Sequence, residues 1–159
     1  MKNLDYGVIG NCKSAALVSK NGSIDWCCLP DFDAPSVLAK ILDDKRGGCF
    51  AVEPVGKYTV EQKYLDKTNI LVTEFSRGGN VFRICDFMPR YKTEDGLYHC
   101  PPDIIRFFMH VKGRPRFRIR YEPRPVYAQY DTSMEVTNKF VKHMTTKGTY
   151  ESLYLYTNI

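Results

Sequence analysis

The sequence predicts a mainly β protein, an antiparallel two-layer β-sandwich with one short helix, and three observations support this fold class. Strand-like runs follow one another along the chain, with turn signals between them. Eleven Tyr and nine Phe residues tilt the composition toward strand-forming side chains. Helical spacing is found in one segment, whereas an α/β fold would require several helices. The 159 residues suit a single domain over residues 1–159 with a sizeable core.

The first predicted elements are two strands at residues 14–20 and 23–29. Asn21-Gly22 joins them, and this dipeptide is typical of a type I′ hairpin turn, in which two residues have positive φ. We therefore expect the chain to open with a β-hairpin.

A loop with two prolines follows this hairpin. Pro30 and Pro35 each fix their own φ and restrict the residue before them, so we expect a shaped projection. A short helix is predicted directly after it, because apolar residues recur at helical spacing from Val37 to Leu42. The carboxylate of Asp33 is placed to cap the first turn of this helix.

The rest of the chain is predicted to form strands. They lie at residues 49–53, 58–65, 69–77, 81–88, 104–111, 116–122, 134–141 and 150–156. The run 116–122 alternates most regularly, which places its apolar residues on one face and its arginines on the other. Residues 89–103 are polar and contain prolines, so we expect a long surface loop there.

Several motifs occur in a fixed order along most of the chain. They include YGVIGN at residues 6–11, GSIDW at 22–26, LPDFDAPSV at 29–37, DFMPR at 86–90 and YEPR at 121–124. In this order the motifs resemble the beginning of bacterial and archaeal glycoside hydrolase family fifteen proteins, the glucoamylase-like and trehalase-like enzymes. The resemblance implies a trehalase-like N-terminal domain with a supersandwich-like β fold, which stands before an (α/α)₆ catalytic barrel.

The resemblance also implies where the chemistry of such enzymes lies. They are inverting α-glucosidases with two glutamates, whose carboxyl groups stand roughly 6.5–9.5 Å apart to admit a water molecule. Both glutamates belong to the barrel, and no position of this sequence matches either, so we expect no catalytic residue here. The expected sandwich is truncated at its C-terminal end, and the barrel is absent.

We therefore expect a non-catalytic accessory domain of a glucoamylase- or trehalase-like glycoside hydrolase, inactive alone. It would pack against its own C-terminal catalytic barrel and meet an α-glucoside substrate only in the full-length protein. The alternative is a stand-alone carbohydrate-binding β-sandwich, for which Tyr150, Ser152, Tyr154 and Tyr156 form the candidate aromatic row. An unpaired sheet edge would also invite a homodimer.

Five residues are candidates for an interface or pocket rim: Trp26, Pro30, Asp31, Phe32 and Asp33. Aromatic rings on a stiff loop can stack on a sugar or anchor an interface, while Trp26 could instead fill the sandwich core. The two aspartates could act as general acid and base, but a capping Asp33 and a solvated Asp31 explain them more simply.

Charge and composition point to few other partners. We expect no cofactor and no metal site, because the three histidines lack partners at ligand spacing and no Cys-x-x-Cys pair occurs. The net charge of +5 is not gathered in a block, so we expect no nucleic-acid partner, and the arginine row at 114–120 fits a solvated or ion-paired face. With no membrane-length apolar run and no signal peptide, we expect a cytoplasmic protein with free thiols.

Overall fold

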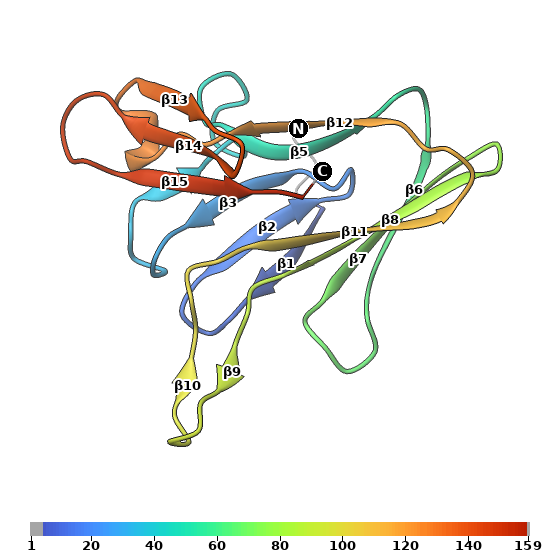
Figure 1. Cartoon of the computed structure of the whole chain (residues 1–159), viewed down its shortest axis with the longest axis horizontal. Helices are drawn as coiled ribbons and strands as arrows, with labels where there is room; N and C mark the ends of the chain where they lie inside the picture. Colours follow the sequence, from blue (N-terminus) through green and yellow to red (C-terminus); the bar gives the residue numbers. More distant parts are fainter. Residues whose placement is uncertain (1–4, 159) are drawn as a thin grey trace.

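The computed structural model describes residues 5–158, and it confirms the predicted antiparallel two-layer sandwich (Figure 1). One layer is sheet A, in the order β1-β2-β3-β5-β12 with β4 paired to β3. Its strands are β1 (Tyr6–Gly10), β2 (Ala15–Ser19), β3 (Ile24–Cys28), β4 (Ser36–Leu38), β5 (Cys49–Pro54) and β12 (Phe117–Glu122).

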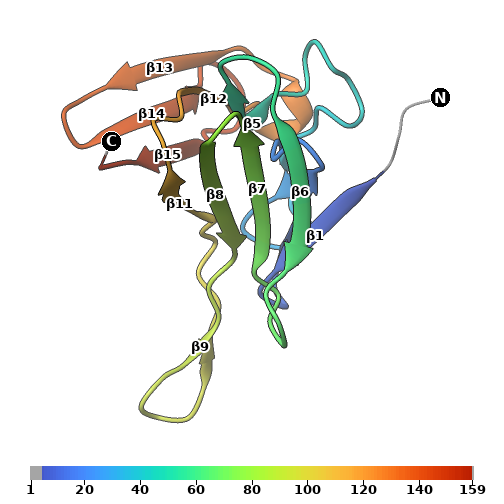
Figure 2. The same ribbon diagram turned by 90° about the vertical axis from the view of Figure 1, so that its right-hand side faces the viewer.

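The second layer consists of two separate sheets, which Figure 2 shows side by side. Sheet B has the order β11-β8-β7-β6, with β6 (Thr59–Tyr64), β7 (Leu71–Arg77), β8 (Asn80–Phe87) and β11 (Ile105–Lys112). Sheet D has the order β13-β14-β15, with β13 (Thr132–Val136), β14 (Phe140–Thr145) and β15 (Ser152–Tyr156). No strand pairing joins sheet B to sheet D within residues 5–158.

The predicted long loop at 89–103 contains a short projecting hairpin, visible below the sandwich in Figures 1 and 2. It pairs β9 (Tyr91–Lys92) with β10 (Tyr98–His99). The prediction of a surface segment is correct, but the two short strands have no alternating pattern long enough to identify them.

The predicted helix between Val37 and Leu42 is wrong. Val37 and Leu38 belong to strand β4, where both side chains are buried beside β3. The chain then turns, and the Leu42 N–H donates to the Ala39 carbonyl oxygen at 2.9 Å. Asp33 consequently caps no helix. The burial of Val37 and Leu38 beside β3 outweighs the local helical spacing. The helical element of the described residues is instead the 3₁₀ turn η1 (Val126–Ala128).

The predicted opening hairpin is confirmed as β2–β3, but its turn differs from type I′. Gly22 has positive φ (72°) and Asn21 does not. The Gly22 N–H donates to the Ser19 carbonyl oxygen at 2.8 Å, which gives a three-residue loop with glycine in the left-handed position. A Cβ at Gly22 would also lie 3.0 Å from Phe75 Cζ, so packing against sheet B favours glycine as well.

Two strand predictions differ from the structure near the ends of the chain. Strand β1 lies in a segment for which the sequence pattern predicts no strand. The predicted strand at residues 134–141 is divided between β13 and β14, because Thr137 forms the turn between them. Its hydroxyl oxygen accepts hydrogen bonds from the backbone N–H groups of Lys139 and Phe140, both at 3.1 Å.

The layers enclose two hydrophobic clusters. The larger is centred on sheet A and receives Leu71 from sheet B and Leu153 and Leu155 from sheet D. The smaller joins the edge of sheet A to sheet B through a stack of phenylalanines, in which neighbouring ring centroids lie 4.7 to 5.2 Å apart: Phe75, Phe82, Phe117 and Phe108. Both second-layer sheets are thus fixed to sheet A rather than to each other.

A buried ion pair links sheet B to sheet A. The Arg106 and Asp86 side chains are 2% and 0% exposed, and the guanidinium donates Nε–H and Nη2–H to the two carboxylate oxygens at 2.8 and 3.0 Å. Arg106 also donates to the carbonyl oxygens of Phe50 and Gly22 in sheet A. The guanidinium lies over the Phe50 ring, 4.8 Å from its centroid. This fork satisfies the buried charges and connects three segments distant in sequence.

His143 is a buried titratable group between sheet D and sheet A. It is 6% exposed, and neither ring nitrogen has a hydrogen-bond partner in the described part of the chain. Its ring meets that of Tyr121 edge to face, with centroids 5.3 Å apart. Burial lowers the pKa of His143 below its ordinary value, the Arg124 guanidinium lowers it further, and the Glu122 carboxylate opposes both.

We predict that Arg106→Leu destabilises the chain by roughly 3–5 kcal/mol, because Asp86 would be left as an unpaired buried carboxylate. Urea unfolding at pH 7 measures this change. Arg83→Leu is the matched control, since its pair with Glu74 is partly exposed and should contribute about 1 kcal/mol or less. Equal losses in the two variants would contradict a structural role for the buried pair.

We also predict an acid-sensitive contribution from His143. The folded pKa lies below the unfolded value of roughly 6.5, so the unfolded chain binds more protons below that pH. The free energy of unfolding is therefore fully retained above about pH 6.5 and falls as the pH is lowered toward the folded pKa. Denaturant unfolding between about pH 5 and 8 should show this slope, and His143→Leu should remove it. His99→Leu, at an exposed position, should retain the slope.

Candidate functional site

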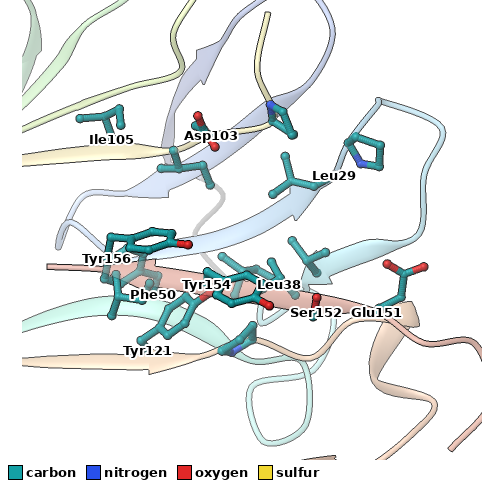
Figure 3. Close-up of a pocket in the computed structure, with 17 residues that line it drawn as sticks. Leu29, Leu38, Phe50, Asp103, Ile105, Tyr121, Glu151, Ser152, Tyr154 and Tyr156 are labelled. Atoms are coloured by element: carbon teal, nitrogen blue, oxygen red, sulfur yellow. The ribbon is translucent and has the colours of Figure 1, made fainter. Parts of the chain in front are cut away.

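An open groove of about 590 Å³ lies between sheet D and the beginning of β11 (Figure 3). One wall is β15 and the residue before it, residues 151–156, and the facing wall is residues 102–105. Leu38, Phe50 and Tyr121 from sheet A form the floor, and Leu29 and Pro30 contribute from the loop after β3. Segments far apart in the sequence therefore meet at one place.

The floor of the groove is apolar and continuous with the sandwich core. The rings of Phe50 and Tyr121 pack edge to face with centroids 5.2 Å apart. Burial raises the pKa of Tyr121 above its ordinary value, so its hydroxyl remains protonated at neutral pH. Leu153 and Leu155 of β15 pack against the same core cluster. The groove therefore leaves part of the apolar surface between the two layers open to solvent.

Two carboxylates border the groove, and Figure 3 shows them well separated along it. Asp103 belongs to the segment before β11, and Glu151 precedes β15. Both residues are exposed, so the two carboxyl groups border the groove from its solvent side. An apolar floor bordered by two separate carboxylates suits the binding of an extended partner that carries polar groups along its sides.

The structure places one of the predicted loop residues, Pro30, in the lining of this groove. Asp31 turns away to form an ion pair with Lys13, Nζ to Oδ1 at 3.2 Å. The Phe32 N–H donates to the Lys13 carbonyl oxygen at 3.0 Å, and this hydrogen bond holds the loop. The Phe32 side chain remains free of the core, and the residue is 61% exposed. Asp33 is exposed near the tip of the loop. Asp31 and Asp33 are thus not arranged as a buried acid and base.

Trp26 lies apart from this loop. It is partly buried in β3, opposite Leu17 of β2, and belongs to neither core cluster of the described residues. The structure brings Pro30, Asp31, Phe32 and Asp33 together, but Trp26 lies on the strand that precedes them.

The outer face of sheet D carries an aromatic cluster. The Tyr154 and Tyr156 rings are nearly parallel, 14° apart with centroids 6.1 Å apart, and are 43% and 69% exposed. Phe140 contacts both rings edge to face. The Lys142 ammonium lies 5.4 Å from the Tyr154 ring centroid and 5.7 Å from that of Tyr150. Three of the four residues in the candidate row thus join a larger face, which we call the aromatic face.

The outer face of sheet B carries an apolar row along its edge strand β11. Ile105, Phe107, Met109 and Val111 alternate along the strand and are 38 to 58% exposed. Arg106 and Phe108 between them point inward to the ion pair and the phenylalanine stack. We call these four residues the β11 row. Rows of exposed apolar side chains of this kind are typical of interaction surfaces.

Sequence reasoning identified the loop and the tyrosines but missed the groove. Its floor residues read as ordinary core positions, and residues 102–105 read as the end of a loop. Only the pairing of distant strands brings them together. The alternation in residues 105–111 places Ile105, Phe107, Met109 and Val111 on one face of a strand, but it does not show that this face points to solvent.

Residues 5–158 contain no group of three or more His, Cys, Asp or Glu side chains that could hold a metal ion. In the same range no helix has the length and apolar character needed to cross a membrane. In the arginine row, Arg120 pairs with Glu53 at 3.1 Å, in the manner of an ion-paired face.

Comparison of the amino-acid sequence with known proteins places the chain in a family. The family model described as trehalase-like, N-terminal matches residues 5–158. A trehalase of Thermoplasma volcanium is 47% identical over 127 residues, which is 78% of this chain and 20% of the relative. A trehalase of Thermoplasma acidophilum is 44% identical over 115 residues, 70% of this chain and 19% of the relative. A trehalase of Mycolicibacterium smegmatis is 39% identical over 70 residues, 43% of this chain and 10% of the relative.

No solved structure matches this chain. The chain spans about a fifth of the length of the two Thermoplasma relatives, and the family model covers all of the described residues. It belongs to the family of trehalase-like N-terminal domains.

Proposed function

We propose that this chain is a non-catalytic accessory domain of a glycoside hydrolase and that it packs against the enzyme's catalytic part. The β11 row carries the proposal, because four apolar side chains at alternate positions are exposed on the outer face of sheet B. The inner face of this sheet already packs in the smaller hydrophobic cluster. The short share of the relatives' length that the chain spans supports a role as one part of a longer protein.

The proposal extends to the loop after β3. Phe32 is exposed on a loop held in place by Lys13, so it offers a rigid aromatic anchor. We propose that Pro30, Asp31, Phe32 and Asp33, with Trp26 on the strand before them, form an interface or pocket rim against the catalytic part.

The proposed substrate of the whole protein is an α-glucoside, either trehalose or a maltooligosaccharide. The names of the relatives support trehalose. A glucoamylase-like activity rests on the resemblance of the sequence motifs alone. A cytoplasmic location is part of the proposal and is supported by six free thiols, which suit a reducing compartment.

A second candidate function is carbohydrate binding by the aromatic face. Two exposed tyrosine rings, stacked nearly parallel, offer an apolar aromatic surface, and Lys142 beside them offers hydrogen-bond donors. Such a surface suits the apolar face of a pyranose ring, with the hydroxyl groups bound at its edge.

We predict that Phe107→Asp in a full-length protein carrying this domain weakens docking of the catalytic part. A loss of about 2 kcal/mol would lower the melting temperature of the whole protein and reduce trehalose hydrolysis. Calorimetry and a glucose-release assay measure both effects. Leu97→Asp is the control, because this residue is 67% exposed at the tip of the projecting hairpin.

The isolated chain provides a second control for that experiment. Phe107→Asp should leave the melting temperature of the 159-residue chain nearly unchanged, since the ring contributes little to its core. The isolated chain should release no glucose from trehalose or maltooligosaccharides. Glucose release by the purified chain, or identical behaviour of the two full-length variants, would contradict the accessory role.

For the second candidate function we predict retarded migration of the chain in a glucan-containing affinity gel. Tyr154→Ala and Tyr156→Ala should each weaken binding by roughly 2- to 10-fold, the equivalent of about 0.5–1.5 kcal/mol per aromatic contact. Tyr91→Ala is the matched control, because that tyrosine is exposed on the projecting hairpin. Migration unaffected by the glucan would exclude this function.

A further inference from the structure

We propose that the side chains of Tyr64 and Asn69 take the place of a partner strand along the free edge of β1, and that they prevent this edge from pairing with a second copy of the chain. The contact is autoinhibitory, since the residues that block the edge belong to the same folded chain. The proposal does not depend on the accessory function, because it uses none of the residues proposed for docking.

Strand β1 has one edge without a partner strand. Within residues 5–158 it pairs with β2 alone, at the end of sheet A. Its sequence, Tyr-Gly-Val-Ile-Gly, contains no charged residue and no proline, which are features that commonly protect an edge strand from other chains. The edge strand β6, which borders the same hollow of the surface as β1, does carry charges, at Glu61 and Lys63. The edge of β1 therefore requires another form of protection.

The hydroxyl group of Tyr64 engages both backbone groups of Val8, the middle residue of β1. It accepts a hydrogen bond from the Val8 N–H at 2.8 Å and donates one to the Val8 carbonyl oxygen at 2.9 Å. In an antiparallel ladder, a residue directly opposite Val8 would exchange the same two hydrogen bonds with it. One hydroxyl group thus reproduces the bonding of one residue of a partner strand.

Asn69 extends this replacement along the edge. Residues two apart on a strand direct their backbone groups to the same side, and the Asn69 side-chain amide donates to the carbonyl oxygen of Gly10. The turn that carries Asn69 is itself held by hydrogen bonds. In it, the Leu65 N–H donates to the Ile70 carbonyl oxygen at 2.9 Å, and the Thr68 N–H donates to the Leu65 carbonyl oxygen at 3.1 Å. The turn therefore presents the amide of Asn69 in a fixed position.

A second copy of β1 is the partner that fits this edge. An antiparallel pair centred on Val8 has a two-fold axis, so the two Val8 residues would exchange their N–H···O=C bonds. In this register Gly10 of one copy lies opposite Tyr6 of the other, and the Gly10 carbonyl oxygen would accept from the Tyr6 N–H. Tyr64 and Asn69 thus occupy backbone groups that such a dimer would use.

Hydrogen exchange of the Val8 amide tests the contact itself. Tyr64→Phe removes the hydroxyl group and keeps the ring, so at low protein concentration the Val8 amide should exchange about tenfold faster than in the unchanged chain. Tyr91→Phe removes an exposed tyrosine hydroxyl on the projecting hairpin and should leave this rate as it is. Equal exchange rates in the Tyr64→Phe chain and the unchanged chain would overturn the proposal.

Sedimentation velocity tests the consequence for association. Tyr64→Ala and Asn69→Ala together uncover the edge, and the dimer dissociation constant of this double variant should be at least about tenfold lower than that of the unchanged chain. Val8→Pro added to the double variant should restore the association of the unchanged chain. Proline is tolerated on an edge strand where its missing N–H faces outward, and it cannot donate to a second copy.

Three outcomes of the sedimentation experiment would overturn the proposal. The first is equal association of the double variant and the unchanged chain. The second is association of the double variant that persists after Val8→Pro, because the dimer would then use another edge. The third is association of the unchanged chain that Val8→Pro abolishes, because β1 would then pair in spite of Tyr64 and Asn69.

Discussion

The buried pair of Arg106 and Asp86 is the interaction on which the arrangement of the layers depends. Neither charge reaches water, so each must find all its partners inside the protein. Arg106 finds them on its own sheet, in Asp86, and on the opposite sheet, in the carbonyl groups of Phe50 and Gly22. A shift of β11 by one residue along β8 would point Arg106 to the outer face and leave Asp86 unpaired. The pair therefore fixes both the register within sheet B and its position on sheet A.

Sheet D is attached to sheet A by different means. Leu153 and Leu155 pack on the large cluster, and His143 meets Tyr121. Arg124 reaches the Thr132 hydroxyl at 2.7 Å. Since sheets B and D are each anchored to sheet A and not to one another, the second layer remains open between β15 and β11. The groove, the aromatic face and the β11 row all border this opening or the outer side of the same layer.

The sequence predicted the parts of the fold that local chemistry determines. The alternation of Phe117, Ile119 and Tyr121 identified β12, and the Asn21-Gly22 signal located the first hairpin. The helix prediction failed because apolar residues near Val37 match helical spacing equally well when a short strand and a turn are both buried. The type I′ turn was wrong because the fit of Gly22 against Phe75, a tertiary contact, requires a different loop.

The candidate site was predictable in part. The loop with Pro30 and Phe32 has a stiff local sequence, and the tyrosines of β15 alternate, so both could be found from the chain alone. The groove could not, because its walls come from segments about 50 residues apart and its shape depends on which strands lack a partner. The same limit applies to Arg106 and Asp86. Each is an ordinary charged residue on an alternating strand, and only the register that pairs them explains their burial.

The measurement that tests this account most directly is the solvent exchange of the Arg106 guanidinium protons by nuclear magnetic resonance. The buried fork predicts a separate Nε–H signal that persists at neutral pH, exchanges slowly, and shows contacts to protons of Phe50 and Gly22 across the two layers. A signal averaged with those of exposed arginines, or one without contacts to sheet A, would contradict the proposed clamp between the layers.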